Sequence, residues 1–290
     1  MNYIKNLLYG AVIGIAEIIP GVSGGTLAVL LGIYDELIAA ISHFTKKIKE
    51  NLKFLIPLLL GMGISILALS HVIKFLLSNY PMAVNFLFLG LIIGILPMLF
   101  KKATSGKFKP INIIPFFITL TIMVILAITS IIHTNNQTII TTMSFPIFLR
   151  FLIIGFLAAV CLILPGISGS MIMVIFGIYD SVINAISELN IIMLLPVGLG
   201  VILGILFGSK IIDYCLKKYS QATFFAILGL VLGSTISIYH RAGFNLMSTQ
   251  GIVALITLIV GIIISFVTTR DNSNNKVECN KSNSDSQIKN

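Results

Sequence analysis

The chain has 290 residues, of which 57% are apolar and only 10% are charged, with a mean hydropathy of +1.05. Soluble domains carry about a quarter charged residues, so this composition excludes an ordinary soluble protein and indicates an all-α polytopic membrane protein. The formal net charge of +9 comes from short basic clusters between apolar runs. That placement favours membrane topology and anionic-lipid contact over nucleic-acid binding.

The first apolar segment begins like a signal sequence, with Lys5 ahead of an apolar run, and then breaks at IIPGVSGGT, residues 18–26. Glu17 interrupts the run and no small-residue cleavage site follows, so we expect the segment to be retained. A proline, three glycines and two hydroxyl residues make this stretch an irregular one inside a membrane segment. Such backbone is tolerated in lipid only where protein or a polar cavity surrounds it.

The same pattern recurs in the middle of the chain. Residues 20–42 align without a gap on residues 165–187, with 13 identities in 23 positions. In a register shifted by six residues the match continues weakly, with Pro57 on Pro196 and Gly61 on Gly200. The sequence therefore predicts a tandem duplication with halves at 1–135 and 146–270.

Each half is predicted to hold a helical hairpin followed by three transmembrane helices. The hairpins cover 4–42 and 150–187, and the helices cover about 54–77, 82–100, 111–133, 190–209, 222–239 and 250–268. The first arm of each hairpin has about 13 residues, or roughly 20 Å of helix, against a hydrocarbon core about 30 Å thick. The arm is too short to cross, so we predict re-entrant hairpins with their tips near the middle of the membrane.

The basic residues support this arrangement. If each hairpin returns to its starting side, the two halves are inverted, and 16 of the 19 basic residues face the side of the N-terminus. Only Lys74, Arg150 and Arg241 then lie on or near the other side. The positive-inside rule places both termini in the cytoplasm. Residues 271–290 contain few apolar side chains and are predicted to form a disordered cytoplasmic tail.

Inverted repeats with helices broken near the midplane are typical of secondary transporters. Where a helix restarts inside a membrane, its free amides and its dipole favour an anion, and glycines let a ligand approach the backbone. A paired site for a phosphate or carboxylate is therefore predicted at the two breaks, or else the glycines serve only close helix packing. The candidate residues are Ser23, Gly24, Gly25, Thr26, Ser168, Gly169 and Ser170.

Lys5 and Arg150 occupy corresponding positions near opposite mouths of the two hairpins. Both could attract an anionic head group. For Lys5 we favour the alternative of anchoring at the membrane interface. Arg150 is the stronger candidate, because its guanidinium can hold a phosphate with two hydrogen bonds.

Four titratable residues are candidates for coupling transport to protons or sodium. Glu17 lies within the membrane segment three residues before Pro20, where an acid is functional by default, although a structural salt bridge is an alternative. His71 lies inside an apolar segment, and a buried or interfacial structural role is the favoured interpretation. Asp35 and Asp180 belong to the repeated GIYD sequence, where we favour a structural role.

The sequence contains no nucleophile elbow, phosphate-binding loop, nucleotide fold or metal-spaced cluster. We therefore expect no enzyme activity, no cofactor and no metal ion. The three cysteines have no metal-type spacing, and filling of apolar space is the expected role of Cys161 and Cys215.

The doubled motif, IIPGVSGGT…LLGIYDELI and LILPGISGSMIMVIFGIYD, resembles the bacterial polyprenyl-phosphate transporter family over nearly the whole chain to about residue 268. The resemblance implies translocation of undecaprenyl phosphate from the outer to the inner leaflet of the cytoplasmic membrane. It also implies head-group handling by the motif residues. Ser170 and Met171 replace Gly25 and Thr26 in the second copy, so an asymmetric pocket is expected.

An ion-coupled, alternating-access lipid carrier is thus the leading hypothesis, with the bilayer and the polyprenyl phosphate as partners and a homodimer as a possibility. An ion-coupled transporter of a small soluble anion is the alternative within transport. A membrane enzyme or scaffold acting on polyprenyl lipids is the alternative from another class.

Overall fold

The computed structural model of the protein describes residues 3–19, 22–106, 109–133, 139–188, 190–243 and 249–288. Pro20 and Gly21, at the break of the first hairpin, lie outside these residues, as do residues 134–138 between the halves. The described chain is helical and contains no strand. Seven of its helices are long and apolar enough to cross a membrane, in agreement with the predicted all-α polytopic class.

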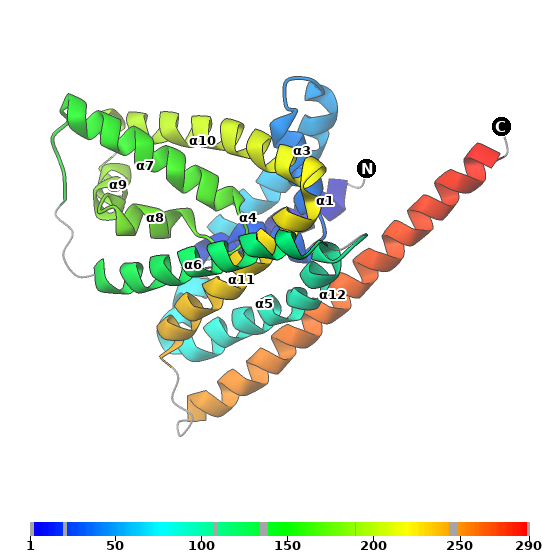
Figure 1. Ribbon diagram of the computed structural model, residues 1–290. Helices are drawn as coiled ribbons and strands as arrows, with labels where there is room; N and C mark the ends of the chain where they lie inside the picture. The colour runs from blue at the N-terminus through cyan, green and yellow to red at the C-terminus, as the bar shows by residue number, and fades with distance from the viewer. Residues whose placement is uncertain are drawn as a thin grey trace.

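The elements of the two halves follow one another in the same order (Figure 1). The first half contains α1 (Tyr3–Ile18), α2 (Gly24–Leu30), α3 (Tyr34–Ser42), α4 (Ile48–Asn79), α5 (Pro81–Ala103), the 3-10 turn η1 (Pro110–Ile113) and α6 (Ile114–His133). The second half contains α7 (Phe145–Ile163), α8 (Gly169–Ile175), α9 (Tyr179–Ser187), α10 (Ile191–Lys218), α11 (Ser220–Ala242) and α12 (Thr249–Ile288).

The second arm of each hairpin consists of two short helices, whereas the sequence predicted one. Gly32 and Gly177 end α2 and α8 with positive φ angles of 72° and 69°. Residues with a side chain adopt this left-handed conformation at a cost, so glycine suits both turns. The turn bends α8 and α9 by 115° relative to each other.

Several helices are longer than predicted. Helix α7 starts at Phe145, and its 19 residues form about 28 Å of helix. This is long enough to cross a membrane. The prediction that the first arm is too short to cross is therefore wrong for the second hairpin. Helix α10 ends at Lys218, not near residue 209, and therefore carries polar side chains that were expected in a loop. Helix α12 continues to Ile288 through most of the segment for which disorder was predicted. Extending an existing helix needs no new nucleus, which is the costly step of helix formation.

The two halves repeat each other's packing. Helix α1 packs along α4 as α7 packs along α10, while α5 packs on α12 as α11 packs on α6. A Cβ atom at Gly61 would collide with the Leu7 carbonyl, and one at the equivalent Gly200 would collide with the Leu152 carbonyl. Small residues at these positions let the helix backbones touch. The duplication seen in the sequence is thus also a duplication of helix contacts.

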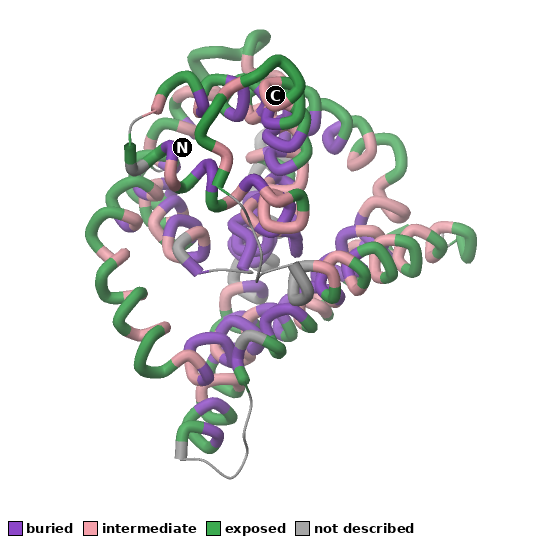
Figure 2. Tube along the Cα trace, turned by 90° about the vertical axis from the view of Figure 1, so that its left-hand side faces the viewer, coloured by how far each residue is buried: buried purple, intermediate pink, exposed green. Residues whose placement is uncertain are grey.

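Helices α5 and α11 pack on each other and contribute side chains to the core of the molecule. Ile95, Leu99, Ile227 and Val231 are buried there. Exposed residues cover the outer faces of the surrounding helices (Figure 2). Many of these outer residues are large and apolar, including Leu67, Phe117 and Ile202, which is the pattern expected of a surface that faces lipid.

Candidate functional site

The two breaks predicted from the sequence meet in the interior. The backbone amide of Gly166 donates to the Thr26 hydroxyl at 2.8 Å, and the Ser23 hydroxyl donates to the Leu164 carbonyl at 3.3 Å. Ser23 and Thr26 are each only 2% exposed. The hydroxyls of the first motif therefore bind the backbone of the second motif directly.

Glu17 is near the end of α1, and its side chain reaches the start of α2. Its Oε1 accepts a hydrogen bond of 3.0 Å from the Gly24 amide, across the break between α1 and α2. A carboxylate is favoured there because the first amides of a helix lack partners within the helix and carry partial positive charge. The equivalent residue of the second half is Leu162, which cannot make this bond. The anion-favouring position of the first motif is thus held by the protein's own acid.

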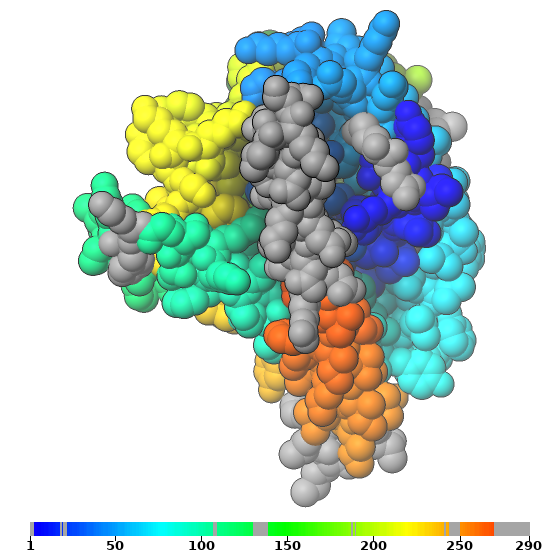
Figure 3. Space-filling model, turned by 90° about the vertical axis from the view of Figure 1, so that its right-hand side faces the viewer, coloured from blue at the N-terminus to red at the C-terminus, as the bar shows by residue number. Residues whose placement is uncertain are grey.

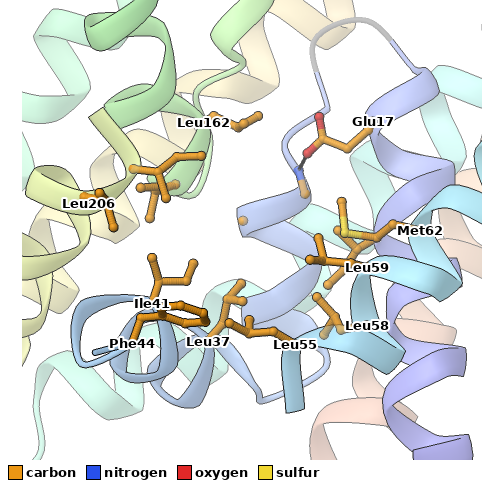
Figure 4. A pocket seen from close by; sticks show the side chains of 15 residues that line it. Glu17, Leu37, Ile41, Phe44, Leu55, Leu58, Leu59, Met62, Leu162 and Leu206 are labelled. Atoms are coloured by element: carbon orange, nitrogen blue, oxygen red, sulfur yellow. Dashed lines mark hydrogen bonds between the residues drawn. The ribbon is translucent and has the colours of Figure 1, made fainter. Parts of the chain in front are cut away.

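A cavity of about 360 Å³ opens beside this acid (Figure 4). Its walls come from the first hairpin and the turn after it, from α4, from the C-terminal end of α7 and from the middle of α10. Leu37, Phe44 and Met62 represent the apolar lining, while Glu17, Gly24 and Gly25 stand at the polar inner end. A cavity of this kind suits an apolar chain that carries one polar or charged group.

The second motif is arranged differently. The hydroxyls of Ser168 and Ser170 lie 2.7 Å apart and bind each other. Both side chains are partly exposed, whereas Gly169 is buried with its Cα facing the Ala158 carbonyl. The asymmetry expected from Ser170 and Met171 is therefore present, and Met171 packs as a buried apolar residue.

The two basic candidates lie at the outer ends of the hairpins. Arg150 donates from Nη2 to the Phe176 carbonyl at 2.7 Å and so satisfies the C-terminal end of α8. Lys5 is exposed on the first turn of α1, with its ammonium 5.4 Å from the centre of the Tyr9 ring. Neither side chain reaches the meeting point of the motifs, so a role of either in head-group binding stays a prediction.

The remaining titratable candidates lie apart from the cavity. Asp35 pairs with Lys102 at 3.1 Å, and Asp180 is exposed on the first turn of α9. His71 is exposed on the outer surface of α4. Of the four candidates for ion coupling, only Glu17 lines the cavity.

Sequence reasoning missed a polar cluster between α3 and α10. Asp213 has a side chain only 10% exposed; its Oδ2 lies 2.7 Å from Lys217 Nζ and 3.7 Å from His43 Nδ1. The Asn51 amide donates to the His43 carbonyl at 2.9 Å. The signal in the sequence was an acid directly after an apolar run, but the predicted helix ended before it.

These features together define a duplicated, multi-pass helical membrane protein with an apolar cavity that ends beside two touching helix breaks. Among the described residues no group of histidine, cysteine or acidic side chains has the geometry of a metal site.

Comparison with known proteins gives the family. Residues 13–250 match the model of a family described as undecaprenyl phosphate translocase-like. The chain is 36% identical over 281 residues to the polyprenyl-phosphate transporter of Staphylococcus aureus strain NCTC 8325, which covers 93% of this chain and 98% of the relative. It is 30% identical over 249 residues to the polyprenyl-phosphate transporter of Vibrio cholerae O1 El Tor, covering 81% and 77%. The chain belongs to this undecaprenyl phosphate translocase-like family, whose members are named as transporters. No solved structure matches it.

Proposed function

We propose that the protein carries undecaprenyl phosphate, or a related polyprenyl monophosphate, from the outer to the inner leaflet of the cytoplasmic membrane. The relatives named as polyprenyl-phosphate transporters support the substrate class. The observation that carries the proposal is the apolar cavity with its single polar end at Glu17, Gly24 and Gly25. A polyprenyl phosphate has the same division into a long apolar chain and one charged head.

The head group is handled where the two motifs touch. A phosphate needs several hydrogen-bond donors at close range, and the amides and hydroxyls of the two breaks would supply them by exchanging the hydrogen bonds that they now make within the protein. The Gly24 amide now binds Glu17, so an entering phosphate competes with this carboxylate for the same donor. Protonation of Glu17, or its neutralisation by sodium, removes the competing charge. This exchange is our proposal for ion coupling.

Opposed membrane orientation of the two halves is the second element of the proposal. In Figure 1 α1 starts at the N mark, on the right of the bundle from which α12 projects, and α7 starts at the left-hand end; both run toward the middle. The right-hand end, shown in Figure 3, carries the N-terminal helix, the 43–47 turn and the junction of α10 and α11. Lys46 and Lys47 lie in this turn, Lys49 follows it, and Lys217 and Lys218 lie at the junction. Lys101 and Lys102 lie at the end of α5, where Lys102 pairs with Asp35 of α3. The positive-inside rule then assigns this end to the cytoplasm.

Transport of a defined lipid tests the proposal. The purified protein is placed in liposomes that contain undecaprenyl phosphate, and an impermeant phosphatase added outside reports the share of lipid in the outer leaflet. We expect the protein to replenish the outer-leaflet pool as it is consumed, at a rate that responds to an imposed proton or sodium gradient. Rates equal to those of protein-free liposomes would refute the proposal.

Further readouts separate the alternatives. Uptake of labelled inorganic phosphate without any polyprenyl lipid would favour a small-anion transporter, and a lipid whose mass changes without phosphatase would favour an enzyme. Glu17→Gln keeps an oxygen that can accept from Gly24 but loses the charge. We expect this variant to transport with no response to the ion gradient, whereas His71→Gln retains the response.

A further inference from the structure

The contact of α3 with α10 breaks the symmetry between the two halves. The packing of α1 on α4, of α2 on α3, of α4 on α5 and of α5 on α12 each has its counterpart in the second half. Helix α3 also packs against α10, near the right-hand end in Figure 1. The counterpart of this contact would join α9 to α4, and these two helices make at most a marginal contact.

A histidine and a buried acid face each other at the contact that is present. Asp213 of α10 lies 3.7 Å from His43, the residue that ends α3, and 2.7 Å from Lys217 of its own helix. The pair between His43 and Asp213 is ionic when the imidazole is protonated. Lys217 stays beside Asp213 whether or not α3 is there, so the buried acid keeps a partner if the two helices part.

The repeat assigns a counterpart to each member of this pair. The hairpins match at an offset of 145 positions, as from Gly10 to Gly155, which takes His43 to Glu188. Helices α4 and α10 match at an offset of 139 positions, as from Gly61 to Gly200, which takes Asp213 to Lys74. The close contacts that glycines make between helices of the first half recur in the second half at these same two offsets. The counterpart pair is therefore an acid and a base with the signs exchanged.

Glu188 and Lys74 are apart in this structure. Both side chains are exposed, and within the described part of the chain neither forms an ion pair. Glu188 ends α9 as His43 ends α3, and Lys74 lies five residues before the last residue of α4 as Asp213 lies five before the last residue of α10. The unmatched charges thus stand at the two surfaces that would meet if α9 packed on α4.

We propose that these four residues are two alternating gates: His43 with Asp213 closes the molecule at the α3–α10 contact, and Glu188 with Lys74 closes it at the other end in a second state. The inference rests on the proposed transport function, because alternating access requires that one gate opens as the other closes. In the structure the first gate is closed and the second is open. Under the proposed topology the open gate faces the outer leaflet, from which the lipid would enter.

The strength of the pairs suits such a device. Exposed ion pairs contribute little, so the pair of Glu188 and Lys74, whose side chains are both exposed, can separate without a large barrier. At the other gate Asp213 keeps its partner Lys217 when His43 leaves, and the choice between states stays sensitive to the bound substrate. Each gate joins two opposite charges, and neither gate joins two like charges. This arrangement also guides each helix to its own partner.

Disulfide cross-linking tests the proposal directly. Cys161, Cys215 and Cys279 are first replaced by serine. The pair His43→Cys with Asp213→Cys and the pair Lys74→Cys with Glu188→Cys are then oxidised in native membranes. We expect both pairs to cross-link, the second only through the alternative state. The control is Lys74→Cys with Asp213→Cys, whose positions lie at the opposite ends of the bundle and should not cross-link in either state. Cross-linking of the 74–188 pair no higher than this control would overturn the proposal.

Charge reversal gives a second measurement that does not depend on new cysteines at the open gate. In the background of the 43–213 cysteine pair, Lys74→Glu or Glu188→Lys should favour the first gate and raise its cross-linking rate about two- to fivefold, as the loss of an exposed ion pair allows. The double reversal should restore the original rate. Additive effects of the two changes would contradict a pair. Cross-linking needs no substrate, so gates that alternate without lipid transport would refute the proposed function alone, and transport without 74–188 contact would refute the gates alone.

Discussion

The two hairpins are copies of one sequence pattern, and they differ most at the cavity and at the contact between α3 and α10. Both have a helix, a break, a short helix and a glycine turn. Their packing against the long helices uses equivalent glycines. The first hairpin alone carries Glu17 at its break, binds the other tip through a threonine hydroxyl, Thr26, and packs its α3 on the long helix of the other half, α10. The duplicated contacts thus build the scaffold, while the unmatched ones lie at the cavity and at the proposed gate.

The scaffold is tested by the largest expected effect. Gly61→Leu and Gly200→Leu would each push a side chain into the backbone of the packed helix, against the carbonyls of Leu7 and Leu152. Overpacking of this kind costs about 3 kcal/mol or more when backbone must move. We expect both variants to lose most of their folded protein, measured as the monodisperse fraction and thermal stability in detergent.

Each half supplies its own control for this test. Gly63 and Gly198 are exposed, and a Cβ atom there would meet nothing within 4 Å. Gly63→Leu and Gly198→Leu should therefore leave stability unchanged or slightly higher, because leucine favours helix more than glycine does. Equal losses at packed and open glycines would show that the equivalent contacts do not hold the halves together.

The contact between the two tips is expected to give a smaller effect. Thr26→Val keeps the shape of the side chain but leaves the buried Gly166 amide without its acceptor. An unsatisfied buried donor costs about 1–2 kcal/mol. The unfolding midpoint in detergent should fall accordingly, and Thr26→Ser, which retains the hydroxyl, should recover part of the loss.

The second half offers the matched change at this position as well. Met171, the equivalent of Thr26, is buried among apolar side chains. Met171→Leu conserves volume and should cost less than Thr26→Val. A larger loss at Met171 would mean that the tip of the second hairpin, and not the hydrogen bond from the first, determines how the two breaks meet.

The sequence predicted what repeats and missed what depends on packing between the halves. The breaks, the duplication and the membrane segments follow from Pro20, Pro165 and the apolar runs between charged clusters. The turns at Gly32 and Gly177 were also present in the repeated GIY sequence, but a glycine in an apolar segment is compatible with a continuous helix. The bond from Gly166 to Thr26 joins residues 140 positions apart. No local pattern indicates such a contact.

The same limit explains why the polar cluster at α10 was missed. Asp213 follows an apolar run for which a helix was predicted only to about residue 209. Asp213 was therefore expected in a loop. Its partner His43 lies in the other half of the chain and comes close only because α3 packs on α10. The offset of the repeat identifies the counterpart of the His43–Asp213 pair only after the contact between α3 and α10 is known. Without that contact there is no pair whose counterpart could be sought.

The smallest expected effect concerns the acids of the repeated GIYD sequence. Asp35 Oδ2 lies 3.1 Å from Lys102 Nζ, and both side chains are partly exposed. Lys102 also sits 4.7 Å from the centre of the Phe224 ring. At the equivalent positions the sequence has Asp180 and Arg241, the side chain of the latter lying outside the described residues. We expect Asp35→Asn to lower stability by less than about 1 kcal/mol, as for other exposed pairs.

A double-mutant cycle measures this pair and its counterpart on equal terms. The cycle combines Asp35→Asn with Lys102→Met, and the matching cycle combines Asp180→Asn with Arg241→Met, each followed by thermal unfolding in detergent. Equal small coupling energies would mean that the GIYD acids belong to the symmetric scaffold and have no part in ion coupling. A coupling found only for Asp35 would add this pair to the contacts made by the first hairpin alone. It would then strengthen the closed α3–α10 end, because Asp35 lies on α3, the helix that His43 ends.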